Sequence, residues 1–202
     1  WLILAAKSAA DGNSSQARRE LAQVRELATA TGRTVLNSQS QKGLKHDLDD
    51  ILTPVERLLS GVELTRECSA RTLDSIISTG ERISVALLAR ALTERDVPAI
   101  PVDARDFVVT DATFGAATVD KKETAVKFAE VSKAWTGKVP IVTGFIGRTK
   151  DGQTTTLGRN GSDYTATLVA GLLKASAVTV WTDVLGVMTA DPAPVPEASP
   201  VH

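Results

Sequence analysis

Short apolar segments that alternate with helical segments constrain the fold of this chain more than any other sequence feature. The segments 97–102, 139–145 and 178–182 are rich in β-branched residues and bounded by residues typical of turns, which is the pattern of strands. Asp120 begins one helical segment, and Ser162 or Asp163 begins another. Because this alternation builds a sheet covered by helices, we expect an α/β fold, a three-layer sandwich with a mainly parallel central sheet.

The first 96 residues are mostly helical by the same criteria. Apolar residues recur at helical spacing in four segments, 14–30, 44–61, 70–78 and 81–95. Gly32 and Gly61 are expected to end the first two helices, Pro54 to kink or restart the second, and Thr79-Gly80 to separate the last two. The chain is therefore predicted to be one domain, with a helical part (1–96) and an α/β part (97–202).

Composition argues against several classes of partner and site. The net charge of −1 gives no basic excess for nucleic acid, so we expect no nucleic-acid partner. A single cysteine, Cys68, excludes an internal disulfide and, with two histidines, argues against a Cys/His zinc site. No apolar run approaches the ~18 residues of a membrane span. We expect no membrane partner and a cytoplasmic location, or a plastid one in a plant or alga.

The segment 143–166 carries the clearest chemical signal. A strand ends in Gly144-Phe145, and a Gly158-Arg159-Asn160-Gly161 loop later opens directly into a helix. The first N–H groups of a helix have no internal partner and attract anions. Arg159 adds a planar fork that matches a carboxylate or phosphate. Physical reasoning alone leaves two interpretations open, an anion site or a purely structural turn and helix cap.

Four ordered sequence blocks resemble the aspartate kinases of the amino acid kinase superfamily. These blocks are the Thr-Thr-Thr-Leu-Gly-Arg-Asn-Gly-Ser-Asp-Tyr-Thr-Ala run (154–166), Trp-Thr-Asp-Val-Leu-Gly-Val-Met-Thr-Ala-Asp-Pro (181–192), Ser-Thr-Gly-Glu-Arg-Ile-Ser (78–84), and Asp-Ala-Arg-Asp (103–106) with Phe-Gly (114–115). Their order and spacing agree with that family over roughly residues 44–199. The resemblance implies an amino acid kinase-like fold and transfer of a phosphoryl group from ATP to the β-carboxylate of L-aspartate.

The resemblance also implies a role for individual residues in the aspartate pocket. Arg159 would hold a carboxylate of aspartate, and Glu81 would pair with its α-ammonium. Ser162 and the backbone at Phe145 would complete the pocket. Asp163 would orient the catalytic lysine.

On the nucleotide side, the resemblance implies that Thr182 and Asp183 contact the nucleoside, with Met188 and Asp191 beside them. Mg²⁺ would be held mainly by the phosphates of ATP, so no protein metal ligands are expected. Met188 stands where the family often has an aromatic residue, and Ala193 stands where it usually has Arg.

The family's Lys-Phe-Gly-Gly segment, which supplies the catalytic lysine, is not found in these residues. We therefore expect a domain incomplete at its N-terminus, inactive as residues 1–202 alone, and a homo-oligomer for the full-length parent. Two alternatives stay open: a superfamily member acting on glutamate, N-acetylglutamate, carbamate or UMP, and a catalytically silent fragment. The parent protein would catalyse the first step of lysine, threonine and methionine biosynthesis.

Overall fold

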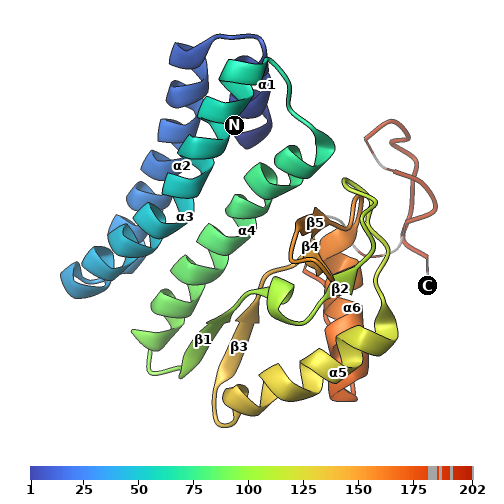
Figure 1. Ribbon diagram of the computed structural model, residues 1–202. Coiled ribbons are helices and arrows are strands. Elements are labelled where there is room, and N and C mark those ends of the chain that lie inside the picture. Colours follow the sequence, from blue (N-terminus) through green and yellow to red (C-terminus); the bar gives the residue numbers. More distant parts are fainter. Residues whose placement is uncertain (182–185, 187, 192, 202) are drawn as a thin grey trace.

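A computed structural model describes residues 1–181, 186, 188–191 and 193–201. Four helices form a bundle on one side of the molecule (Figure 1). Their bounds are α1 (Leu2–Ala10), α2 (Ser14–Val35), α3 (Ser38–Thr65) and α4 (Ala70–Thr93). Each of the three longer helices begins at a side-chain cap, provided by Asn13, Asn37 and Ser69.

The strands lie between α4 on one side and α5 and α6 on the other (Figure 1). Strands β1 and β3 pair in parallel, while β4 pairs in parallel with β2 and antiparallel with β5. The bounds are β1 (Ala99–Val102), η1 (Ala104–Asp106), β2 (Val109–Thr110), α5 (Lys121–Val131), η2 (Ser132–Trp135), β3 (Val139–Val142), β4 (Ile146–Thr149), β5 (Thr154–Thr156) and α6 (Gly161–Leu173). The predicted α/β architecture with parallel strands and covering helices is confirmed.

The predicted helix breaks are wrong, because packing overrides local propensity. Gly32 lies inside α2 and Gly61 inside α3. Pro54 also lies within α3, whose buried stripe along the bundle stabilises the helix despite the missing N–H. Thr79 and Gly80 lie inside α4.

One predicted strand is also absent from the described residues. Residues 178–181 form no strand; Trp181 is 92% exposed, and the segment pairs with no strand in the described part of the chain. A strand needs a neighbour as well as β-branched residues. Residue 182 lies outside the described residues.

The described residues form two separate hydrophobic cores, one in the helical bundle and one in the α/β part. One lies within the helical bundle, and Ile76 and Ile83 place α4 in it. The other lies between the strands, α5 and α6, where Phe107, Phe128 and Trp135 pack edge to face with ring centroids 5.2–6.1 Å apart.

No helix among the described residues is long and apolar enough to cross a membrane.

Candidate active site

Two of the predicted substrate residues, Glu81 and Ser162, approach the backbone of Gly144. Gly144 follows β3, and a Cβ built on it would lie only 3.0 Å from Ser162 Oγ and 3.1 Å from Ser162 Cα. Burial raises the pKa of the Glu81 carboxyl, and the nearby backbone amide of Gly144 lowers it in part. Glu81 on α4 and Ser162 on α6 therefore approach the same glycine. A side chain at position 144 would force this backbone away from Ser162.

The backbone around Phe145 is fixed against the start of α6. Phe145 has a left-handed backbone (φ 68°), and its N–H donates to Thr165 Oγ1 at 3.1 Å. Its carbonyl accepts from the N–H of Leu157 at 2.8 Å. A Cβ on Gly161 would lie 2.9 Å from the Phe145 ring. These contacts hold the end of β3 and the beginning of α6 in one arrangement.

Helix α6 begins at Gly161 without the predicted side-chain cap. Asn160 occupies the cap position with a left-handed backbone and makes no capping hydrogen bond with its side chain. Ser162 and Asp163 instead lie in the first turn. Both side chains are exposed, as is Arg159 in the preceding loop. The loop and the first turn of α6 therefore present a guanidinium, a hydroxyl and a carboxylate around the positive end of the helix.

Burial disfavours the ionised form of Glu81. Desolvation raises the pKa of its half-buried carboxyl, and the Gly144 amide partly offsets that rise. A ligand ammonium would remove much of the desolvation penalty of the ionised carboxylate. The half-buried position of Glu81 therefore favours the binding of a cationic ligand group.

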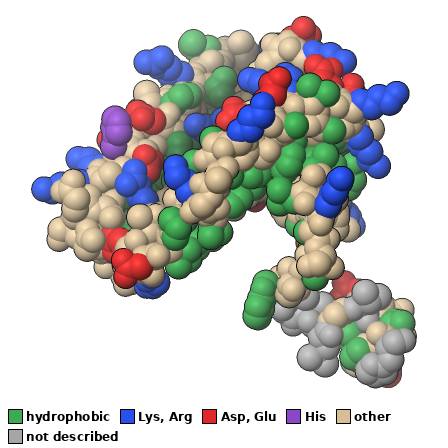
Figure 2. Space-filling model, turned by 90° about the horizontal axis from the view of Figure 1, so that it is seen from below, with side chains coloured by type: hydrophobic (Ala, Val, Ile, Leu, Met, Phe, Trp, Pro, Cys, Tyr) green, Lys and Arg blue, Asp and Glu red, His purple; other side chains and the backbone are tan. Residues whose placement is uncertain are grey.

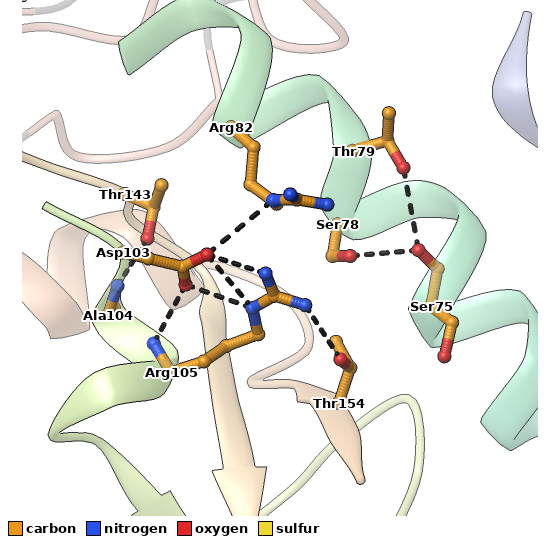
Figure 3. A network of polar contacts seen from close by, with 9 residues as sticks. All are labelled: Ser75, Ser78, Thr79, Arg82, Asp103, Ala104, Arg105, Thr143 and Thr154. Carbon is orange, nitrogen blue, oxygen red and sulfur yellow. Dashed lines mark hydrogen bonds and ion pairs between the residues drawn. The ribbon is translucent and has the colours of Figure 1, made fainter. Parts of the chain in front are cut away.

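A polar network next to Glu81 joins α4 to the strands (Figure 3). Asp103 accepts hydrogen bonds from Arg105 Nε at 2.9 Å and Nη2 at 2.6 Å, and Arg82 Nε lies 3.5 Å from it. Arg105 in turn donates to Thr154 Oγ1 at 3.0 Å. Burial alone would raise the pKa of Asp103, but the Arg105 hydrogen bonds and both arginine charges lower it below its usual value.

A groove of about 540 Å³ runs from this network between α3, α4 and β1. Arg82 and Thr143, the sequence neighbours of Glu81 and Gly144, line this groove together with Asp103. Thr143 Oγ1 accepts the N–H of Ala104 at 2.7 Å, which ties the end of β3 to η1. In a view from below, hydrophobic side chains gather in the middle of the molecule and charged ones around its rim (Figure 2).

The predicted nucleotide residues are only partly described. Thr182 and Asp183 lie outside the described residues. Met188 is half-buried and forms an antiparallel bridge with Pro200. The carboxylate of Asp191 is exposed and accepts the N–H of Ala193 at 2.9 Å. Their roles toward a nucleotide stay predictions.

Two structural contributors were missed by sequence reasoning. Asp74 is buried in α4, with 1% of its surface exposed, and its carboxylate accepts hydrogen bonds from Gly115 and Thr156. A carboxylate on the buried stripe of a helix is unusual, and this was the available signal. The approach of Gly144 to Ser162 has no signal in the sequence, because it depends on how the end of β3 packs against α6.

The model of the amino acid kinase family matches residues 4–202, so the chain belongs to that family. Over 144 residues it is 41% identical to lysine-sensitive aspartokinase 3 of Escherichia coli (strain K12), a match that covers 68% of this chain and 32% of that protein. Over 174 residues it is 37% identical to the chloroplastic aspartokinase 1 of Arabidopsis thaliana, covering 82% and 30%. The chain spans about a third of the length of the curated relatives it matches.

Solved structures agree with this assignment. The chain superimposes on E. coli aspartokinase III in complex with aspartate and ADP, in its R-state, with a TM-score of 0.88. The sequences are 32% identical, and the match covers 99% of this chain and 44% of the other. The T-state structure of that enzyme, with lysine and aspartate, gives a TM-score of 0.83 at the same identity and covers 98% and 44%.

Proposed function

We propose that the protein is an aspartate kinase, which transfers the γ-phosphoryl group of ATP to the β-carboxylate of L-aspartate. The observation that carries the proposal is the approach of Glu81 and Ser162 to Gly144 from two distant helices. An acceptor amino acid carries both an ammonium and carboxylates, so its site needs an anion and a cation. Glu81 supplies the anion, and Arg159 supplies the cation on the loop before Ser162.

The chemistry needs positioning more than a protein nucleophile. A β-carboxylate oxygen attacks the γ-phosphorus, the bond from this phosphorus to the bridging oxygen breaks, and the electron pair leaves with ADP. The product is 4-phospho-L-aspartate. Glu81 holds the α-ammonium, while Arg159 and Ser162 hold a carboxylate. Asp163 orients the family's catalytic lysine. Holding both reactants in line accounts for a large part of such a rate enhancement.

The nucleotide is proposed to lie beside Thr182, Asp183, Met188 and Asp191. The related E. coli enzyme was solved with ADP, which supports a nucleotide donor for this protein. Mg²⁺ neutralises phosphate charge when it is bound with ATP. Among the described residues, no cluster of three or more His, Cys, Asp or Glu is arranged to hold a metal. We propose that the nucleotide phosphates are the main ligands of Mg²⁺.

An acceptor screen on the complete encoded protein tests the proposal. Mg-ATP would be supplied with aspartate, glutamate, N-acetylglutamate, carbamate or UMP, and ADP release would be measured. Hydroxylamine would trap an acyl phosphate as its hydroxamate. We expect turnover and hydroxamate with aspartate. Turnover with another acceptor instead would move the protein to a different branch of the family, and none at all would favour a silent protein.

We further propose that the protein acts in the cytoplasm or a plastid, and as a homo-oligomer. The matched relatives include bacterial aspartokinases and a chloroplastic one, which supports this choice of compartments. Fractionation of the source cells would test the compartment, and light scattering of the complete protein would test the assembly.

A further inference from the structure

Asp74 links three segments that lie far apart in the sequence. Its Oδ2 accepts the N–H of Gly115 at 2.9 Å and the N–H of Thr156 at 2.9 Å, and its Oδ1 accepts the hydroxyl of Thr156 at 2.8 Å. These partners are 41 and 82 residues away along the chain. A buried carboxylate with three such donors is held firmly, since each bond to a charged group is strong and leaving it unmade is costly.

The two partners of Asp74 both support the loop that carries Arg159. Thr156 ends β5, and the chain enters the loop two residues later at Gly158. Gly158 has a left-handed backbone (φ 75°), and a Cβ on it would lie 3.1 Å from the Gly115 carbonyl. Asp74 thus holds both the strand that leads into the loop and the segment that packs behind it.

Asp74 and Glu81 share one face of the same helix. They are seven residues apart within the continuous helix α4, which corresponds to about two turns and about 10 Å along the axis. One face of α4 therefore carries the residue proposed to bind the ammonium and the residue that fixes the loop of Arg159 and Ser162. The helix itself therefore sets the separation between Asp74 and Glu81.

We propose that Asp74 is a positioning residue, which sets the distance between Glu81 and the Arg159–Ser162 loop and so sets the fit for the acceptor amino acid. The proposal rests on the proposed function. It assigns to Asp74 no contact with either substrate. Its effect should therefore fall on the acceptor, whose two binding elements it holds together, more than on ATP.

The test compares variants of the complete protein by steady-state kinetics. Asp74→Ala leaves three hydrogen-bond donors without their acceptor. It is expected to raise the KM for aspartate roughly tenfold or more, with a smaller change in the KM for ATP. Asp74→Asn keeps an oxygen for both backbone N–H groups and a donor for the Thr156 hydroxyl. It should therefore restore most of the aspartate affinity. Thr156→Val removes one of the three bonds and should lie between the two.

Thr124→Val is the matched control. Thr124 is also completely buried, and its hydroxyl accepts the N–H of Val109 at 3.0 Å, on the far side of the strands. It should lower the melting temperature and leave both KM values unchanged. If Asp74→Ala behaves like Thr124→Val, Asp74 is only a structural anchor and the proposal is overturned.

Hydrogen exchange of peptides covering 157–165 separates this proposal from the proposed function. Asp74→Ala should accelerate exchange there, and Thr124→Val should not, whether or not aspartate is the acceptor. Should Asp74→Ala fail to fold, Thr156→Val and Asp74→Asn give the same ordering. Unchanged exchange in every Asp74 and Thr156 variant would overturn the positioning role. A wild-type protein inactive on aspartate would overturn only the function.

Discussion

At the scale of single residues, Arg159 offers the most direct test of the pocket. Its guanidinium is exposed, on a loop whose backbone is fixed at Gly158 and Asn160. Arg159→Ala should lower kcat/KM for aspartate roughly a hundredfold, because two charge-assisted hydrogen bonds to a carboxylate are lost. Arg159→Lys should recover only part of this, since an ammonium lacks the planar fork. Equal activity of the wild type and the alanine variant would contradict the assigned role.

Glu81 should show a conflict between stability and function. Its folded pKa is raised by burial, so the folded state binds this proton more tightly than the unfolded state does. The stability contributed by the protonated form is present below the ordinary glutamate pKa, and it is lost as pH rises through the raised value. Glu81→Gln should therefore melt at a higher temperature than the wild type at about pH 7 and lose that advantage near about pH 4.

The same substitution should weaken catalysis, since an uncharged amide pairs poorly with the α-ammonium of aspartate. The measurements are melting curves across pH and kcat/KM for aspartate. A lower melting temperature for Glu81→Gln at neutral pH would show that the carboxylate stabilises the fold, against the argument from burial.

At the scale of elements, the glycines that were expected to end helices respond in opposite ways. Gly61 is exposed within α3, and a Cβ there would meet nothing within 4 Å. Gly61→Ala should stabilise the protein by about 0.5–1 kcal/mol through its better helix propensity. A Cβ on Gly32 would lie 2.5 Å from Leu44 in the bundle core. Gly32→Ala should lower stability, as urea titrations of the two variants would measure.

These elements show what sequence could and could not predict. The strands β1 and β3 and the cap at Asp120 followed from local signals. The continuous helix α4 did not, because the Ser78 and Thr79 hydroxyls bond to the Ser75 carbonyl within the helix, which no turn signal reveals (Figure 3). Packing decides such cases.

The candidate site also has residues that the sequence predicts and residues whose role only the fold shows. Glu81 and Ser162 could be named from sequence blocks that match a family. The role inferred for Asp74 depends on backbone N–H groups 41 and 82 residues away. Only the folded arrangement of α4, β5 and the segment around Gly115 brings these groups together, so a linear pattern cannot encode the contact by itself.

At the scale of the whole molecule, two cores depend on one shared helix. Helix α4 contributes Ile76 and Ile83 to the bundle core, while Asp74 and Arg82 on the same helix contact the α/β part. Folding of the two cores should therefore be coupled through these polar contacts. Weakening them should uncouple the cores before it unfolds either one.

Asp103→Ala should produce this uncoupling. Without the carboxylate, the like charges of Arg82 and Arg105 are no longer separated by an anion. Arg82 already feels this repulsion, since burial lowers its pKa and the charge of Arg105 lowers it further. We expect hydrogen exchange along a urea series to give α3 and α5 peptides one midpoint in the wild type and separate midpoints in the variant. Asp49→Ala is the control, because it breaks the half-exposed 2.5 Å Arg25–Asp49 pair between α2 and α3 and should shift the common midpoint without splitting it. A single midpoint in Asp103→Ala would mean that apolar contacts of α4 alone couple the two cores.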